Sequence, residues 1–375
     1  MPARKRRRST SEVPDGRVML SLEAFGWDEF FAQSFAPFVC EGYSAGRVAV
    51  QHKSQYELYT EYGELSGETT GRMQYDARSR KDLPVVGDWV VIRAREQEGK
   101  ATIYDILPRR SRFSRKAAGT KTEEQIVAAN IDTVFLVMGL DGNFDLRRLE
   151  RYLVLAWESG ADPVIVLNKA DLCGDIEQKV REAQSVTLDV PVVVMSAIED
   201  RGLDQVLGRI KPGTTGALLG SSGVGKSTIV NHLLGKELLK TREVRRTDDR
   251  GRQTTTRREL IVLPSGGLLM DTPGMRELQL WGGDEGILDA FQDIAELAER
   301  CPYRDCRHGP EPHCAVQQAL RDGTLDTARF ASYEKLQKEI GYFIRREDKP
   351  AEVIEKERWR KVSVARKRLN KARGR

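Results

Sequence analysis

One short segment constrains the fold of this 375-residue chain more than any other feature. It runs from Gly220 to Ser227 with the sequence GSSGVGKS, follows the apolar residues 217–219 and precedes a helix-like stretch at 227–234. Glycines let such a loop close with its backbone N–H groups aimed at phosphate oxygens, and the helix N-terminus adds positive potential. The segment therefore predicts a P-loop between a strand and a helix of an α/β domain.

The chemistry of a P-loop assigns roles to its residues. We expect Lys226 to reach the β- and γ-phosphates and to act in catalysis, and Ser227 to be a ligand of Mg²⁺. The residues of this segment that are expected to bind the nucleotide are Gly220, Ser221, Ser222, Gly223, Val224, Gly225, Lys226, Ser227 and Thr228.

A second motif predicts which base is bound. Asn168, Lys169, Ala170 and Asp171 (NKAD) follow an apolar strand-like run at 163–167. A carboxylate at Asp171 can accept two hydrogen bonds from guanine, whereas adenine would leave this charged acceptor unpaired. We expect Asn168 to brace the loop and the base edge, and the stem of Lys169 to pack over the base.

A further loop strengthens the guanine prediction. Ser196 and Ala197 follow the apolar run 190–194, and the backbone N–H of Ala197 can meet guanine O6. Two such loops in a chain with a P-loop indicate a guanine-nucleotide site.

Two more segments resemble nucleotide-sensing switches. Asp271 begins a DxxG pattern that ends at Gly274, where we expect Asp271 to hold Mg²⁺ through water and the Gly274 N–H to meet the γ-phosphate. The threonine run 254–256 lies upstream in a polar loop. We favour Thr255 as the residue that closes on Mg²⁺ and the γ-phosphate, with its two neighbours left open. The expected catalytic residues are Lys226, Thr255, Asp271 and Gly274.

The residue after the DxxG pattern predicts slow hydrolysis. Met275 stands where many GTPases carry a water-orienting glutamine. We therefore expect Gln253, a backbone group or a partner to position the water.

The first third of the chain predicts a helix followed by a small barrel. Residues 22–35 carry aromatic residues at helical spacing, which indicates one amphipathic helix. From Gly42 the period changes to two, and glycines separate the runs 47–50, 56–59, 88–92 and 102–106. Short strands with glycine-rich turns are typical of a barrel such as an OB-fold.

Beyond residue 112 the pattern alternates strands and helices, as in a parallel sheet covered on both faces. Apolar strands are predicted at 133–137, 163–167, 190–195, 217–219 and 268–270, and a helix at 146–157. Beyond residue 285 the chain is helical and charged. The predicted divisions are a basic tail and helix (1–41), a barrel (42–112), a permuted GTPase domain (113–284), a mostly helical zinc domain (285–345) and a basic tail (346–375).

A cysteine cluster predicts a metal site. Three of the five cysteines, Cys301, Cys306 and Cys314, crowd around His308. Three thiolates and one imidazole form a closed tetrahedral zinc set without the open position that catalytic zinc needs, so we expect one structural zinc ion. His313 is a competing ligand, but it adjoins Cys314, so that both would reach one ion only awkwardly. An odd, sparse cysteine count favours a reducing compartment over a disulfide framework.

The order of the motifs is reversed relative to a standard GTPase, because the base-reading loops precede the P-loop. This order indicates a circular permutation. The sequence resembles the circularly permuted GTPases of small ribosomal subunit biogenesis, the RsgA family, over residues 42–336. The segments that carry the resemblance are 86–90, 129–132, 168–171, 220–227, 251–256, 271–274 and 301–314.

The resemblance implies an OB-fold N-domain, GTP hydrolysis stimulated by the small ribosomal subunit, and a role in late maturation of that subunit. It also favours His308 as the fourth zinc ligand. Many family members have a histidine where this chain has Gln253, so a catalytic role of that histidine does not carry over.

Charge is segregated along the chain. The total is +5, but Met1–Arg8 carries +5 and Lys356–Arg375 carries +9, which leaves −9 for the body between them. Basic ends favour electrostatic attachment to rRNA phosphates. No apolar run is long enough to span a bilayer. We therefore expect the protein to be cytoplasmic, and we expect it to be a monomer. Its expected partners are the small ribosomal subunit with its rRNA, and GTP or GDP. The alternatives are an ATPase or P-loop kinase, which Asp171 opposes, and a nucleotide-switched RNA-binding factor with little intrinsic catalysis.

Overall fold

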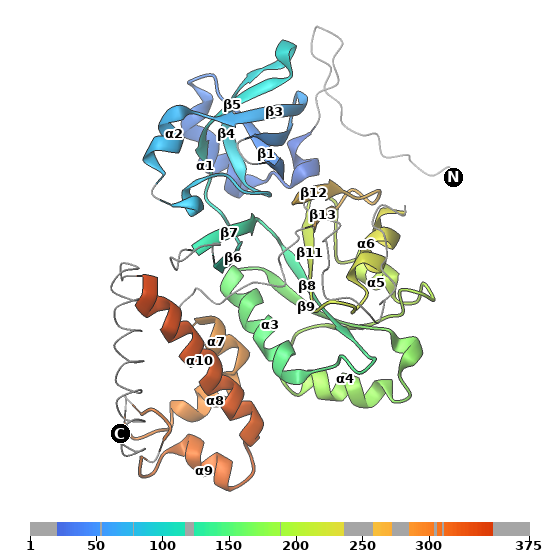
Figure 1. The fold of residues 1–375 in the computed structure, drawn as a ribbon, viewed down its shortest axis with the longest axis vertical. Coiled ribbons are helices and arrows are strands. Elements are labelled where there is room, and N and C mark those ends of the chain that lie inside the picture. The colour runs from blue at the N-terminus through green and yellow to red at the C-terminus, as the bar shows by residue number, and fades with distance from the viewer. Residues whose placement is uncertain are drawn as a thin grey trace, which may run out of the picture.

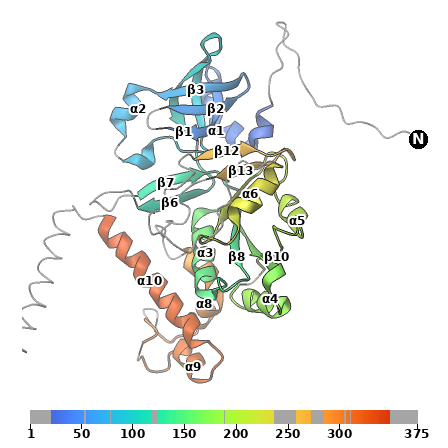
Figure 2. The ribbon, with the colours of Figure 1, turned by 45° about the vertical axis from the view of Figure 1, so that its right-hand side comes forward.

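The computed structural model describes the chain as three consecutive modules. The described residues are 21–52, 55–77, 79–116, 124–187, 189–235, 258–271, 285–303, 306–309 and 311–347. Both basic ends, Thr255 with the rest of its loop, and the segment from Thr272 through Gly274 to Met275 lie outside them. The barrel and the helical module lie at opposite ends, with the α/β domain between them (Figures 1 and 2).

The N-terminal module is a closed five-stranded barrel, as expected of an OB-fold. Its strand order is β1-β2-β3-β5-β4, and pairing of β4 with β1 closes it. Alternate residues such as Val48, Leu58 and Ile92 fill its interior. Its elements are β1 (Ser44–Gln51), β2 (Tyr56–Thr60), β3 (Gly63–Thr69), α2 (Gly71–Asp76), β4 (Trp89–Arg95) and β5 (Lys100–Ile106).

The predicted single helix over 22–35 is wrong. The chain forms a short 3-10 helix, Leu22–Phe25, and then α1 (Glu29–Val39). Gly26 separates them with φ +89°, a left-handed conformation that favours glycine, and the Asp28 side chain caps α1 by accepting from the Phe30 N–H.

The central domain is a six-stranded sheet in the order β10-β9-β8-β11-β13-β12, parallel except for β12. Its strands are β8 (Thr133–Gly139), β9 (Asp162–Asn168), β10 (Val192–Val194), β11 (Thr215–Leu219), β12 (Glu259–Val262) and β13 (Leu268–Asp271). A separate hairpin, β6 (Arg112–Lys116) with β7 (Glu124–Ala129), precedes it.

Helices cover both faces of this sheet. Successive residues of its strands face opposite sides, and both sets are apolar, so each face packs against helices. Leu136 on β8 packs in the cluster of α3 (Leu146–Ser159) and α4 (Ile176–Gln184). Its neighbour Phe135 packs in the cluster of α5 (Leu203–Leu207) and α6 (Lys226–Leu234). The predicted two-faced parallel sheet is confirmed.

A buried arginine joins the barrel to the central domain. Arg47 on β1 is 2% exposed. Its guanidinium donates to the carbonyl oxygens of Phe25, Gly87 (3.3 Å) and Asn130 (2.9 Å) and to Thr215 Oγ1 at the start of β11 (2.9 Å). Burial lowers its pKa to about 10. Together with the pairing of β1 and β12, this network sets the barrel against the strand that leads into the P-loop.

The C-terminal module consists of helices that pack on α3 (Figure 1). They are α7 (Glu285–Ala290), α8 (Gln292–Ala298), α9 (Ala315–Arg321) and α10 (Thr327–Glu347). Within the described residues, none of the helices combines the length and apolar character needed to cross a bilayer. The predicted domain limits stay predictions.

Candidate guanine-nucleotide site and metal cluster

The predicted nucleotide-binding loops meet at one edge of the sheet. Strands β8, β9, β10, β11 and β13 are parallel, so their carboxyl ends lie together, where ligands of α/β sheets bind. The NKAD loop follows β9, the Ser196–Ala197 loop follows β10, the P-loop follows β11, and Asp271 ends β13. The reversed motif order in the sequence therefore still yields one site in space.

The P-loop wraps into the start of α6 as its sequence predicts. Gly223 and Gly225 have φ of +81° and +96°, and α6 begins at Lys226. A Cβ on Gly225 would lie 2.3 Å from Asn168 Nδ2, so only glycine fits there. Lys226 Nζ donates to the carbonyl oxygens of Gly220 (2.7 Å) and Ser221 (2.6 Å), so it lies over the loop.

Asn168 connects three motifs. It is 2% exposed, and its Nδ2 donates to the Val224 carbonyl oxygen of the P-loop at 2.8 Å. Its Oδ1 accepts from the Ala197 N–H at 3.1 Å. Asn168 thus braces the loops, and its expected contact with the base edge stays a prediction. A bond from the Ala197 N–H to guanine O6 requires this N–H to be shared with Asn168.

A serine orients the carboxylate predicted to read guanine. Ser196 is fully buried, and its hydroxyl donates to Asp171 Oδ1 at 2.6 Å. Asp171 itself is exposed, and a carboxylate has more acceptor sites than the one that Ser196 uses, which leaves acceptor capacity toward a base. Ala170 is anchored because its N–H donates to the Met195 carbonyl oxygen at 3.1 Å. The Asp171 carboxylate is thus fixed by the neighbouring loop.

Sequence reasoning missed three residues beside these loops. Asp141 accepts from Lys169 Nζ at 2.5 Å, and Lys169 has φ +65°. Asn143 Oδ1 accepts from Ser221 Oγ at 3.2 Å and from Arg148 Nη1 at 2.6 Å. The sequence did contain a signal for Asp141 and Asn143, because both follow shortly after the apolar strand β8, whose carboxyl end lies at this edge of the sheet.

The position of Asp271 suits a carboxylate near the phosphates. The register of β13 on β11 places Met270 opposite Ala217, so the end of β13 lies beside the start of the P-loop. Burial, and to a lesser extent the negative charge of Glu259, raises the pKa of Asp271. A nearby cation would favour its ionised form. The other expected phosphate-sensing residues, Thr255 and Gly274, lie outside the described residues.

The predicted metal ligands lie together in the helical module. The ligand atoms of Cys301, Cys306, His308 and Cys314 are all within 4.8 Å of one another. The Sγ atoms of Cys301 and Cys314 are 3.8 Å apart, and His308 Nδ1 lies 3.7 and 3.6 Å from them. A tetrahedral zinc ion with bonds of about 2.3 Å to sulfur and 2.0–2.1 Å to nitrogen separates such ligands by about 3.6–3.8 Å. The donor set and its spacing therefore fit zinc.

Local structure presents these ligands. Cys314 caps α9 and its Sγ accepts from the Gln317 N–H, while Gln317 Nε2 donates to the His308 carbonyl oxygen at 2.6 Å. His308 is 8% exposed and has φ +55°. His313 is exposed and does not belong to the cluster. The geometry thus selects His308 over the competing histidine.

Comparisons with known families identify two matching models. A model described as RsgA GTPase matches residues 106–281, and one described as 50S ribosome-binding GTPase matches residues 215–354. The second match begins with the strand before the P-loop, because the motifs from there onward keep the standard order in this chain.

Named relatives cover almost the whole chain. A protein of Opitutus terrae, named small ribosomal subunit biogenesis GTPase RsgA, is 46% identical over 95% of this chain and 100% of its own. A similarly named protein of Oceanobacillus iheyensis is 43% identical over 86% of this chain and 92% of its own.

Solved structures show the same architecture. YjeQ from Thermotoga maritima has 26% identity and a TM-score of 0.60, with 80% of this chain and 98% of that chain covered. YloQ, described as a circularly permuted GTPase, has a TM-score of 0.58 at 24% identity, with 82% and 96% covered. The permuted order inferred from the motifs therefore matches a known fold.

Proposed function

This chain belongs to the RsgA family of GTPases, and from that membership we propose that it hydrolyses GTP in the biogenesis of the small ribosomal subunit. The proposed reaction is attack of water on the γ-phosphate, with GDP and phosphate as products. GTP binding and hydrolysis switch the protein between a subunit-bound and a released form.

The single observation that carries the nucleotide part of the proposal is the position of Asn168. One side chain bonds both the P-loop and the Ser196–Ala197 loop, so the phosphate-binding and base-reading loops form one connected site. The Ser196 hydroxyl donates to the Asp171 carboxylate and so fixes its orientation within this site. An acceptor at that place favours guanine over adenine.

The proposed catalytic work is positioning and charge stabilisation, which dominate phosphoryl transfer. The P-loop N–H groups and Lys226 hold the β- and γ-phosphates, and Ser227, Thr255 and Asp271 hold Mg²⁺. When bound, Mg²⁺ neutralises charge on the phosphate oxygens. The Gly274 N–H meets the γ-phosphate. Because Met275 replaces a glutamine, we expect turnover to be slow until the small subunit positions the water.

The other parts of the chain attach the enzyme to its partner. We propose that one zinc ion, held by the Cys₃His cluster, maintains the helical module. The barrel, this module and the basic ends contact rRNA, with an affinity that falls steeply as salt rises. The protein works as a cytoplasmic monomer.

GTP turnover by the purified full-length chain tests the proposal. Turnover is measured alone, with small subunits and with large subunits at equal concentrations. We expect strong stimulation by small subunits only. Stimulation by large subunits alone would contradict the proposed partner. GTP binding without turnover under any condition would favour a nucleotide-switched RNA-binding factor instead.

A further inference from the structure

Two adjacent arginines at the start of α3 contact different parts of the molecule. Arg148 Nη1 donates to Ser221 Oγ in the P-loop at 3.2 Å and to Asn143 Oδ1 at 2.6 Å. Arg147 Nη2 donates to Asp326 Oδ2, directly before α10, at 2.8 Å. One helical turn therefore touches both the phosphate-binding loop and the metal-binding module.

A buried ionic network continues this connection. Glu150 on α3 is fully buried, and its Oε1 accepts from Arg147 Nη1 at 2.5 Å and Arg329 Nη1 at 3.1 Å. Arg329 on α10 also holds both carboxylate oxygens of Asp293 on α8, each at 2.7 Å. Removing one partner of such a buried network leaves an uncompensated charge, so the network resists separation of α3 from α8 and α10.

Close packing of α7 against α3 also fixes the helical module on the central domain. A Cβ on Gly286 of α7 would lie 2.5 Å from Glu158 Cγ and 3.1 Å from the Val154 carbonyl oxygen, both on α3. Farther along, Arg151 of α3 pairs with Glu339 of α10 at 2.5 and 2.8 Å. The module is therefore held along α3 by close packing as well as by charge.

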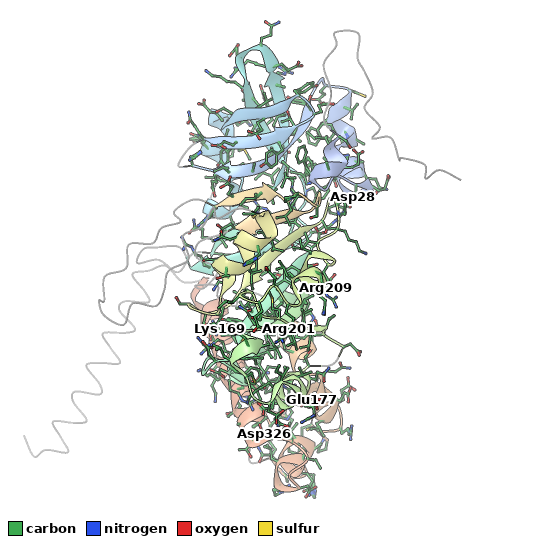
Figure 3. The ribbon with its side chains drawn as sticks, turned by 90° about the vertical axis from the view of Figure 1, so that its right-hand side faces the viewer. Asp28, Lys169, Glu177, Arg201, Arg209 and Asp326 are labelled. Atoms are coloured by element: carbon green, nitrogen blue, oxygen red, sulfur yellow. The ribbon has the colours of Figure 1, made fainter. Side chains whose placement is uncertain are left out.

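The helices held in this way present the metal ligands. The helix that contains Asp293 ends three residues before Cys301, and Cys314 caps α9, which leads to Asp326 and α10. Figure 3 shows Asp326 toward the helical end of the molecule and Lys169 in the central domain. The connection from Ser221 to the helices around the Cys₃His cluster thus runs through the side-chain bond of Arg148, the backbone of the first turn of α3, and the side-chain bonds of Arg147.

We propose that α3 couples the nucleotide site to the metal-binding module, with Arg148 as the positioning residue that holds Ser221 of the P-loop. This inference rests on the proposed guanine-nucleotide and zinc sites. Bound nucleotide orders the P-loop, and the ordered loop fixes Asn143, Arg148 and the first turn of α3. The module docked on that turn then loses less freedom on binding metal, which gives positive coupling.

Coupling of this kind is a free energy shared by both sites, so it can be measured from either one. The full-length protein is loaded with zinc, and its apparent zinc affinity is measured by chelator competition with and without GDP. GDP affinity is measured by titration on the same samples. We expect GDP to tighten zinc binding about fivefold, the lower end of common coupling strengths.

Arg148→Ala is the decisive variant. We expect it to abolish the effect of GDP on zinc affinity while the zinc affinity without GDP stays at the wild-type value. Arg148→Lys, which keeps a cationic donor near Ser221 and Asn143, restores a measurable part of the effect. Arg181→Ala is the matched control, because Arg181 lies on α4 in an exposed pair with Glu177, which Figure 3 labels.

The outcomes separate this inference from the proposed function. GDP binding with no effect on wild-type zinc affinity would overturn the coupling alone. A GDP effect that persists in Arg148→Ala would also overturn it. A chain that does not bind GDP at all would overturn both.

Discussion

The side-chain amide of Asn168 donates to the backbone carbonyl oxygen of Val224 at 2.8 Å, although 56 positions separate them in the chain. The same amide accepts from the Ala197 N–H. One buried side chain therefore joins the two loops, and we expect base recognition and phosphate binding in the proposed site to depend on it.

Replacing Asn168 by alanine tests this dependence. Asn168→Ala leaves the Val224 carbonyl and the Ala197 N–H without their partner, and each such loss costs about 1–3 kcal/mol. We expect GDP and GTP affinity to fall at least about tenfold, which corresponds to 1.4 kcal/mol. Titration with a fluorescent guanine nucleotide measures the change. Gln178→Ala removes an exposed amide on α4 and should leave affinity unaltered. Equal affinities of Asn168→Ala and the wild type would show that the bridge is dispensable.

Asp171→Asn tests how the base is read. An asparagine keeps an oxygen for the Ser196 hydroxyl but presents an N–H donor to the guanine amine. We expect GTP affinity to fall at least about a hundredfold, because unpaired polar groups are strongly rejected in such sites. Xanthine carries a carbonyl in place of that amine, so affinity for XTP should rise. Competition binding with GTP, XTP and ATP measures this change.

The control for this substitution is Asp175→Asn. Asp175 caps α4 through the Gln178 N–H, and asparagine caps a helix about as well as aspartate. Unchanged GTP preference in Asp171→Asn would mean that the base is not read by this carboxylate.

Cys314→Ser tests the metal cluster. Serine replaces the thiolate by a hydroxyl, which breaks the Cys₃His set at a buried position at the start of α9. We expect zinc content to fall from one ion per chain toward none, and the melting temperature to drop by roughly 5 °C or more. Metal analysis and thermal unfolding provide the two measurements. Cys40→Ser is the control, because Cys40 is exposed and outside the cluster. Wild-type protein that contains no zinc after expression with ample zinc would refute the assignment.

Arg47→Met tests the junction between barrel and central domain. Methionine keeps much of the volume but takes the guanidinium donor away from Thr215 Oγ1 and the Asn130 carbonyl oxygen, while the Gly87 carbonyl oxygen keeps its bond from Asn130 Nδ2. We expect a loss of about 2–4 kcal/mol in the free energy of unfolding. Faster hydrogen exchange of the β1 and β4 amides would report it. Arg209→Met, at an exposed position (Figure 3), should leave exchange unchanged. Wild-type exchange rates in Arg47→Met would contradict the bridging role.

Much of the fold could be predicted because its signals are local. The strands of the central sheet are continuous apolar runs, and the P-loop lies between a strand and a helix in the sequence itself. Strand β3 was missed because its sequence GELSGET offers little hydrophobic alternation, and it is held by pairing with β2 and β5. The helix break was missed because the aromatic spacing continues past Gly26, whose positive φ ends the first turn.

The sequence by itself determined which chemical groups this protein has and in what order: the P-loop segment, the NKAD motif with its carboxylate, the permuted order and the Cys₃His group. These depend on residue types at short spacings. Only the tertiary structure decided that Asn168 joins the loops, that Arg47 sets the barrel, and that Arg147 and Arg148 face different modules. Such contacts link residues far apart in the chain. They depend on which strand ends and helix faces packing brings together, and no short spacing encodes that.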